Sequence, residues 1–283
     1  MSGILYLVST PIGNLEDITM RALGILRQVD LIACEDTRHT RKLLSHYQIS
    51  KPLTALHEHN ERARAAGLAD KLEAGIDIAL VCDAGTPTVS DPGYRLVREA
   101  VQRGIRVVSI PGPSALITAL AASGLPTDQF TFAGFLPARR GARRARLAEL
   151  ATSRATLIFY EAPHRITQTI TDALEVLGNR QCVIARELTK FHEEFLRGSL
   201  AEIEEAMKDA QVKGEIVLLI GPPLDDNLTR PVTASLLNEV EALMLEQGID
   251  RKSALKRVAR SRGITKSEAY RLMLAEQAKS DRE

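Results

Sequence analysis

The apolar positions in the first half of the chain switch repeatedly between two spacings. Short β-branched runs predict buried strands, and between them apolar residues recur three and four positions apart, as on one face of a helix. Residues 19–29 show this helical pattern, with Leu26 and Val29 on one face, and residues 62–74 and 94–103 repeat it. Because strands and helices alternate, we predict an α/β fold with a largely parallel sheet and crossover helices. The predicted strands are residues 4–9, 31–34, 53–57, 78–82 and 106–110.

A second block of strands begins after Gly124-Leu125-Pro126, where the pattern pauses. Residues 225–231 are typical of a linker, and the remainder has helical spacing. We therefore predict three parts: an N-terminal α/β domain (1–123), a second α/β domain (124–224), and a linker with a basic C-terminal helical module (225–283). The strands predicted in the second block are residues 130–135, 156–160, 182–186, 194–197 and 215–220.

The composition is that of an ordinary soluble globular protein. The chain has 283 residues, of which 45% are hydrophobic and 26% charged, enough apolar material for more than one core without disulfides or metals. No apolar stretch approaches the roughly 20 residues that span a bilayer, and the N-terminus lacks the pattern of a signal peptide. We therefore expect a cytoplasmic protein. Cys34, Cys82 and Cys182 have no metal or redox spacing and are expected to be buried thiols.

Positive charge is concentrated in two segments although the formal net charge is only +1. Residues 139–146 contain five arginines and no acid, and residues 248–283 contain ten Lys and Arg against five Asp and Glu. Local basic blocks in a nearly neutral chain favour contact with a polyanion at particular places.

The predicted strands of the first half end in loops rich in glycine, proline or polar residues. The carboxyl ends of parallel strands lie on one edge of the sheet, where open α/β folds bind ligands. The dinucleotide and P-loop glycine motifs are absent from the sequence. Asp83 could accept hydrogen bonds from a ligand or cap its own turn. The five loops are residues 10–14, 35–40, 58–61, 83–87 and 111–114.

Two histidines that flank an acid, His57 and His59, allow a metal alternative. On a strand they would share a face, and Asp83 or Asp36 could complete the site. The spacing is not that of the zinc motif H-E-x-x-H, and the sequence shows no third ligand.

Five motifs together resemble one known family. They occur in order between about residues 4 and 220, and several are long enough to be specific. They are similar to motifs of the ribosomal RNA small subunit 2′-O-methyltransferase I family, which is similar to the tetrapyrrole methylases. The motifs are LYLVSTPIGNLEDIT at 5–19, EDTRHT at 35–40, DAGTP at 83–87 with SDPG at 90–93, PGPSA at 111–115 and ARELTK at 185–190.

The resemblance implies a fold, a cofactor and a substrate. It implies two α/β domains of the tetrapyrrole methylase type with S-adenosyl-L-methionine in the cleft between them. It also implies a homodimer and, as the target, a cytidine ribose of 16S rRNA in the small ribosomal subunit.

Position within the matched motifs also implies cofactor-binding residues. The relatives' G-D-P stretch corresponds here to residues from Gly85 onward, but Thr86 replaces its acid and Asp83 stands three residues earlier. The resemblance therefore leaves open which of these residues contacts the cofactor. The predicted cofactor-binding residues are Ile12, Asp83, Gly85, Thr86, Pro87, Val89, Ser114, Ala115 and Tyr160.

Methyl transfer to a ribose needs few catalytic groups. Displacement at a sulfonium requires positioning and partial desolvation more than covalent help. A ribose hydroxyl is a poor nucleophile, so a general base or an orienting cation should assist. Among Glu35, Asp36, His57, Glu187 and Lys190, we predict Asp36 as the base and Lys190 as the cation, with ordinary surface ion pairing as the alternative for each.

The arginine run and the C-terminal helices are the predicted RNA contacts. The run is either a phosphate-binding patch or a solvated helix start. In the tail, Thr265 and Glu268 form a capping-box pattern that opens a helix with Ala269 and Leu272 inward, as in a helix-turn-helix. A dimer-packing or solvated helical cap is the alternative. The predicted contacts are Arg38, Arg139, Arg140, Arg143, Arg144, Lys256, Arg257, Arg260 and Arg262.

Three other functions compete with rRNA methylation. The first is methylation of a tetrapyrrole or another small molecule, which the basic blocks disfavour because a macrocycle needs no phosphate contacts. The second is a non-enzymatic RNA-binding protein, disfavoured by five loops on one edge. The third is a metal-dependent phosphoesterase that uses His57 and His59.

Overall fold

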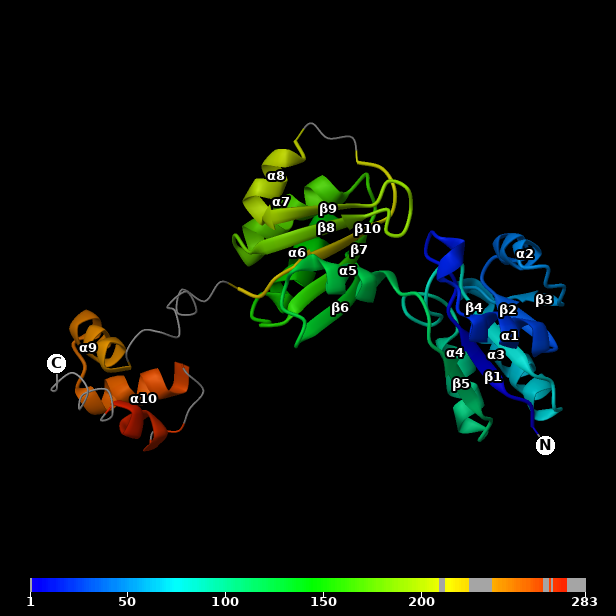
Figure 1. Ribbon diagram of the computed structural model, residues 1–283, viewed down its shortest axis with the longest axis horizontal. Coiled ribbons are helices and arrows are strands. Elements are labelled where there is room, and N and C mark those ends of the chain that lie inside the picture. Colours follow the sequence, from blue (N-terminus) through cyan, green and yellow to red (C-terminus); the bar gives the residue numbers. More distant parts are fainter. Residues whose placement is uncertain (1, 209–211, 224–235, 262–264, 266, 274–283) are drawn as a thin grey trace. The chain divides into compact units, whose positions relative to one another are not determined.

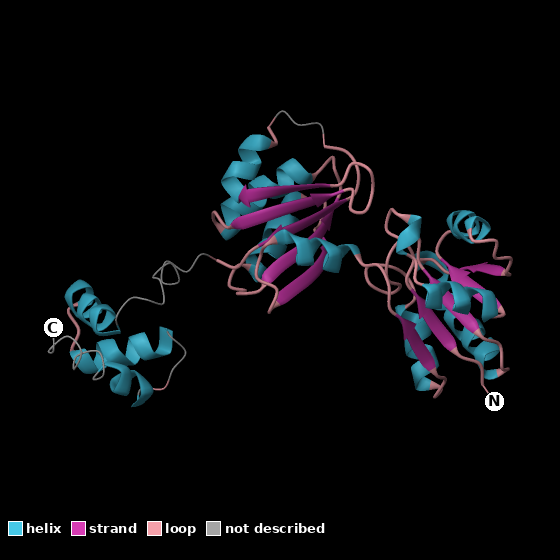
Figure 2. Cartoon of the chain, viewed as in Figure 1, coloured by secondary structure: helices cyan, strands magenta, loops and turns pink. Residues whose placement is uncertain are grey.

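The structure, a computed structural model, describes residues 2–208, 212–223, 236–261, 265 and 267–273. By its internal contacts the chain divides into two compact units, Met1–Pro223 and Leu224–Glu283. The first unit contains two five-stranded sheets, and the described residues of the second are mainly helical (Figures 1 and 2). The predicted α/β class is confirmed.

The first sheet is wholly parallel, with strand order β3-β2-β4-β1-β5. Leu5 in β1 pairs with Ile78 in β4 and Val107 in β5. All five predicted strands are confirmed, although β3 ends earlier than predicted because His57 is the N-cap of a helix. The strands are β1 (Leu5–Val8), β2 (Leu31–Cys34), β3 (Leu53–Ala55), β4 (Ile78–Val81) and β5 (Val107–Ile110).

Helices cover both faces of this sheet because successive strand residues point to opposite faces. Tyr6 and Val8 share one buried cluster with α1 and α2. Leu5 and Leu80 share another with α3 and α4. The three helices predicted in this half are confirmed. In addition, α2 begins within the loop predicted at residues 35–40, and the first turn of α3 occupies the loop predicted at residues 58–61. The helices are α1 (Met20–Gln28), α2 (Thr37–His46), α3 (Glu58–Glu73) and α4 (Tyr94–Gln102).

The second sheet is mixed, with strand order β6-β7-β10-β8-β9, and only β6 and β7 are parallel. Its five strands are also confirmed, within one or two residues. They are β6 (Phe130–Phe135), β7 (Thr156–Glu161), β8 (Gln181–Arg186), β9 (Glu194–Ser199) and β10 (Ile216–Ile220).

Four helices enclose the second sheet. Phe159 on one face joins a cluster with α6, α7 and α8, while Ile158 on the other packs with α5. The sequence-based division at residue 123 groups α5 with the first sheet, but the structure packs it on the second. The helices are α5 (Ala115–Ser123), α6 (Arg140–Leu150), α7 (Ile166–Leu177) and α8 (Leu200–Ala206).

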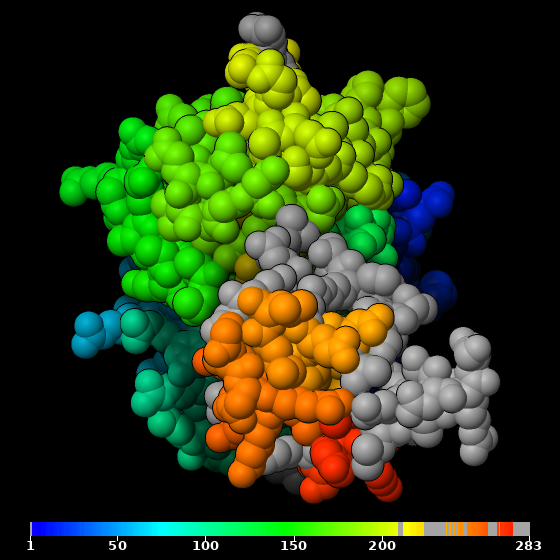
Figure 3. Space-filling view, turned by 90° about the vertical axis from the view of Figure 1, so that its left-hand side faces the viewer, coloured from blue at the N-terminus to red at the C-terminus, as the bar shows by residue number. Residues whose placement is uncertain are grey.

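The second unit has its own small core. Val240 on α9 (Leu236–Gln247), Val258 on α10 (Arg251–Ser261) and Ala269 in the helical residues 267–273 are buried in one cluster, and the space-filling view shows α9 and α10 in orange (Figure 3). The Glu268 amide donates to the Thr265 hydroxyl at 3.3 Å, as in the predicted cap. Leu272 was predicted to face inward, which is wrong: it is 45% exposed, and Met273 is buried instead.

No helix among the described residues is long and apolar enough to cross a membrane.

Candidate functional site

Hydrogen bonds connect the loops that follow three strands of the first sheet. Thr10 and Gly85 form an antiparallel bridge, with N···O distances of 2.9 and 3.0 Å in the two directions. The Thr86 hydroxyl donates to the Pro113 carbonyl at 3.2 Å. The loops after β1, β4 and β5 therefore meet at the carboxyl edge of the sheet, as predicted.

The segment after β3 is the beginning of a helix. His57 is the N-cap of α3, and its Nε2 lies 3.0 Å from the side-chain nitrogen of Asn60. Glu61 is buried and accepts two backbone N–H groups at the start of α4, at 3.0 and 2.7 Å. The prediction that His57 and His59 share one face of a strand is therefore wrong, because both lie at the start of α3. Within the described residues, no group of three or more His, Cys, Asp or Glu could hold a metal ion.

The second sheet brings distant segments to a common edge through antiparallel pairing. β10 runs antiparallel to both β7 and β8, so Ile216 pairs with Glu161 at the end of β7 and with Arg186 at the end of β8. The start of one strand therefore lies beside the ends of two others. Residues 160–163, 188 and 214–217 consequently line one cavity.

That cavity has a volume of about 390 Å³ and is also lined by the first-sheet loops. Cofactor sites commonly have volumes of about 300 to 1,000 Å³. Of the predicted cofactor-binding residues, Pro87 is buried and is not part of the lining. The others all line the cavity: Ile12, Asp83, Gly85, Thr86, Val89, Ser114, Ala115 and Tyr160.

The sequence did not single out several other residues of this cavity. Phe132 and Phe135 stack edge-on against Tyr160, with ring centroids 4.9 and 5.6 Å apart, and Phe135 reaches the cavity. A sequence signal existed for four of them: Ala84 lies in the DAGTP motif, Ser90 and Asp91 in the SDPG motif, and Leu188 in the ARELTK motif. The other lining residues missed include Glu161, Gly214, Glu215 and Val217.

Two strained turns place apolar side chains in the cavity wall. Val89 and Leu188 both line the cavity, and each lies between two non-glycine residues with positive φ. Such backbone costs about 1–3 kcal/mol per residue and clusters at binding and catalytic sites. The strain therefore makes this cavity the candidate functional site. The strained residues are Thr88 (74°), Ser90 (64°), Glu187 (51°) and Thr189 (65°).

Asp91 is a half-buried carboxyl group in the cavity lining. Burial raises the pKa of Asp91 to about 6, and the charge of Glu35 adds to the rise, against a hydrogen bond with the Cys82 thiol. Burial, with the charge of Asp91, also raises the pKa of Tyr160 to about 12. Near neutral pH the Asp91 carboxyl group is therefore mostly ionised, and its negative charge attracts a cationic ligand.

Asp36, the predicted base, has a local structural role. Its carboxylate accepts the Arg38 backbone N–H at 2.7 Å as the cap of α2 and pairs with the Arg38 guanidinium at 2.7 Å. These interactions hold the pKa of Asp36 well below its usual range, so it is a poor proton acceptor near neutral pH. Asp36 lines neither this cavity nor the next one. Its backbone N–H donates to Asp83 at 3.2 Å.

A second cavity, of about 320 Å³, lies beside the first and contains Lys190, the predicted cation. The Lys190 Nζ donates to Glu187 at 2.8 Å and to Glu215 at 3.1 Å. Burial lowers the pKa of Lys190, but these two carboxylates outweigh it and raise the pKa, so the amine keeps its charge. The residues that line both cavities are Ile12, Asp83, Ala84 and Glu215.

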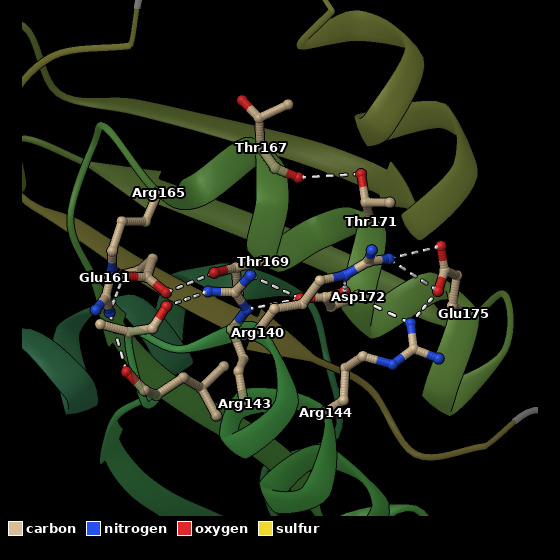
Figure 4. Close-up of polar contacts among 12 residues, drawn as sticks. Arg140, Arg143, Arg144, Glu161, Arg165, Thr167, Thr169, Thr171, Asp172 and Glu175 are labelled. Atoms are coloured by element: carbon tan, nitrogen blue, oxygen red, sulfur yellow. Dashed lines mark hydrogen bonds and ion pairs between the residues drawn. The ribbon is translucent and has the colours of Figure 1, made fainter.

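Three of the five arginines in the run pair with two acids of another helix, α7 (Figure 4). Arg143 is buried and pairs with Asp172 of α7 at 2.7 Å, with both side chains at most 2% exposed. Arg140 also bonds Asp172, at 2.9 Å, and Arg144 pairs with Glu175. The prediction that Arg143 contacts a phosphate is therefore wrong, because its guanidinium is buried against the Asp172 carboxylate.

The remaining predicted RNA contacts differ in exposure. Arg139 is exposed, and Arg38 is exposed beside its partner Asp36. Lys256 and Arg257 are exposed on α10. The side chain of Arg260 and all of Arg262 lie outside the part of the chain that the structure describes.

Comparison with known proteins gives first the class of protein. Residues 4–204 match the family Tetrapyrrole (Corrin/Porphyrin) Methylases. A crystal structure of uroporphyrin-III C-methyltransferase from Thermus thermophilus, complexed with S-adenyl homocysteine, superposes with a TM-score of 0.55. The superposition covers 77% of this chain and 97% of the Thermus thermophilus chain, and the sequences are 19% identical. At this identity the similarity is one of fold. The fold is that of the tetrapyrrole methylases.

Closer relatives define the family more narrowly. A protein from Halalkalibacterium halodurans is 48% identical over 95% of this chain and 94% of its own. A protein from Vibrio cholerae is 57% identical over 77% of this chain and 76% of its own length. Both are named ribosomal RNA small subunit methyltransferase I. This chain belongs to that methyltransferase family.

Proposed function

We propose that this chain transfers the methyl group of S-adenosyl-L-methionine to the ribose 2′-hydroxyl of a cytidine in 16S rRNA. The names of the relatives support the RNA substrate. The observation that carries the proposal is the cavity of about 390 Å³ between the first-sheet loops and the carboxyl end of β7, bordered by two strained turns.

The residues of this cavity fit S-adenosylmethionine. Apolar side chains such as Ile12 and Val217 suit an adenine ring, and the Asp91 carboxylate suits a sulfonium or ammonium group. Gly85 has a φ of 86°, and its lack of a side chain lets a ligand approach the backbone. We assign the cofactor to the predicted residues that line the cavity, without Pro87.

The chain's own residues then position the reactants and move one proton. When bound, the cofactor supplies a methyl group whose bond to sulfur breaks, leaving its electron pair on sulfur, as the bond to the ribose oxygen forms. Val89 and Leu188 contribute apolar surface to the cavity wall, which favours desolvation of the reacting groups. Lys190 orients the ribose oxygen. Asp83, which lines both cavities, replaces Asp36 as the proposed acceptor of the hydroxyl proton.

The proposal includes the setting of the reaction. The substrate is 16S rRNA or the small ribosomal subunit, in the cytoplasm. The division into domains 1–123, 124–224 and 225–283 remains our proposal, with α5 serving the second sheet. A homodimer is proposed from the resemblance, and sedimentation of the purified chain tests it. Phe135 and Phe191 are exposed apolar side chains available to such a contact.

Mapping of methylated riboses in small-subunit RNA tests the proposed function. RNA from cells with and without the gene is compared, and we expect one cytidine to lose its 2′-O-methyl group. Addition of the purified chain and S-adenosylmethionine to the unmethylated subunits should restore it. Identical maps from both strains would contradict RNA methylation and favour a small-molecule substrate.

A further inference from the structure

The basic helix α2 and the second cavity form a continuous surface beside the cofactor cavity. We propose that the second cavity binds the target nucleotide and that α2 is the phosphate-binding wall that leads the RNA strand to it. This inference rests on the proposed rRNA methylation and adds the path of the substrate.

Shared lining residues connect three cavities in a row. Asp83 and Glu215 line both the cofactor cavity and the second cavity. Lys42 lines the second cavity and a third, open one of about 620 Å³ on the surface of α2. A strand that lies along α2 therefore reaches the cofactor through the second cavity. The third cavity is lined by Arg38, Arg41, Lys42, Ser45 and His46.

The charge of α2 is less neutralised than that of the arginine run. α2 contains no acidic residue, and Arg41 and Lys42 are exposed. Within the described chain they form no ion pair. Arg143, by contrast, is buried against Asp172. Uncompensated cations on an exposed helix attract phosphates, whereas paired ones gain little from them.

The second cavity has the groups that a nucleotide requires. Lys42 supplies a cation and His39 a ring N–H donor for a phosphate at its α2 side. Asp83 and Glu215, at the wall shared with the cofactor cavity, are acceptors for ribose hydroxyl groups. Lys190 lies beside Glu215 and remains charged. The order phosphate, ribose, methyl donor thus follows the order of the lining residues.

The first test compares two double variants that each remove two positive charges from the full chain. Arg41→Ala with Lys42→Ala changes α2. Arg95→Ala with Arg98→Ala changes α4, which packs on the opposite face of the sheet from α2. Both of these arginines are exposed. Filter binding of single-stranded oligocytidylate is measured across a salt series. The slope is that of the logarithm of the binding constant against the logarithm of the salt concentration. Each lost phosphate contact reduces the magnitude of this slope by roughly 0.7.

We therefore expect the slope to fall by about 1.4 in the α2 variant and to stay unchanged in the α4 variant. The exchange Arg41→Lys with Lys42→Arg should restore it, because both charges return. Calorimetry should give unchanged S-adenosylmethionine affinity in every variant. Equal salt-dependence slopes in the two alanine variants would overturn the proposed path of the RNA along α2. So would normal RNA binding with weakened binding to purified small-subunit proteins, which would make α2 a protein-docking face.

The second test blocks the cavity itself. Leu15 lines the second cavity but not the first and is 39% exposed, so Leu15→Trp adds bulk at low cost to folding. We expect slower methylation, an unchanged salt slope and unchanged cofactor affinity. Normal methylation would overturn the assignment of the cavity. A wild-type chain that leaves every ribose unmethylated would instead overturn the proposed function.

Discussion

Asp91 shows how burial changes the chemistry of one carboxyl group. Its pKa is raised to about 6, first by burial and then by the charge of Glu35, whereas in an unfolded chain it is about 3.9. Between about pH 4 and 6 the folded chain holds a proton that the unfolded chain has lost. The group therefore contributes stability at low pH that disappears as the pH rises through about 6.

The same ionisation should control cofactor affinity. Ionised Asp91 attracts the cationic cofactor, so affinity should fall below about pH 6, by up to about tenfold per pH unit. Calorimetry at a series of pH values measures this. Asp91→Asn should bind more weakly near neutral pH and show a flatter profile. Parallel profiles for the variant and the wild type would assign the pH dependence to another group.

Ser114 offers a direct way to fill the cofactor cavity. It is the N-cap of α5, but its side chain makes no capping hydrogen bond, so replacement should cost little stability. Ser114→Trp should reduce S-adenosylmethionine affinity at least about a hundredfold, about 2.7 kcal/mol, with little change in Tm. Ser50→Trp, at an exposed loop position, is the matched control. Normal binding by Ser114→Trp would move the cofactor elsewhere.

The pairing of α6 with α7 makes the arginine run a structural element. Although burial raises the pKa of Asp172, hydrogen bonds from Arg140 and Arg143 lower it below its ordinary value. Its stabilising effect is therefore present above about pH 4 and is lost as the pH falls through the lowered pKa. Arg143→Ala leaves a buried carboxylate with weaker pairing.

We expect Arg143→Ala to cost about 3–5 kcal/mol in the free energy of unfolding, measured in urea. Arg139→Ala, at an exposed position of the same run, should change it by less than about 0.5 kcal/mol. If Arg143→Ala left stability intact and flattened the salt dependence of RNA binding, the buried pair would not describe the protein in solution.

The two compact units predict the effect of truncation. Unit Met1–Pro223 contains both sheets, their cores and the cavities, and the second unit has a separate core. A chain that ends at Pro223 should therefore keep its Tm and cofactor affinity. Its RNA affinity should fall, with a salt slope lower by roughly 0.7 to 0.9 for each phosphate contact of α10 lost. Loss of cofactor binding on truncation would show that the second unit supports the site.

Local pattern was sufficient to predict the strands, the parallel direction of those in the first half and the sheet edge at which the cavity lies. Each strand and each loop after it is a short segment whose composition reflects its own burial. The motif at 83–87 was long enough to indicate a site there, and eight predicted residues line the cavity. Capping chemistry was missed at Asp36 and His57, because polar helix starts and ligand loops use the same residue types.

Pairing across the chain decided the rest. The antiparallel register of β10 brings Val217 opposite Tyr160, and a local pattern carries no information about which strands pair. The acid that neutralises Arg143 is Asp172, 29 positions away on another helix, so the run appeared free when considered alone. The raised pKa of Asp91 likewise depends on burial and on Glu35. Charge and periodicity are properties of a segment, but burial and ion pairing exist only once distant segments have packed together.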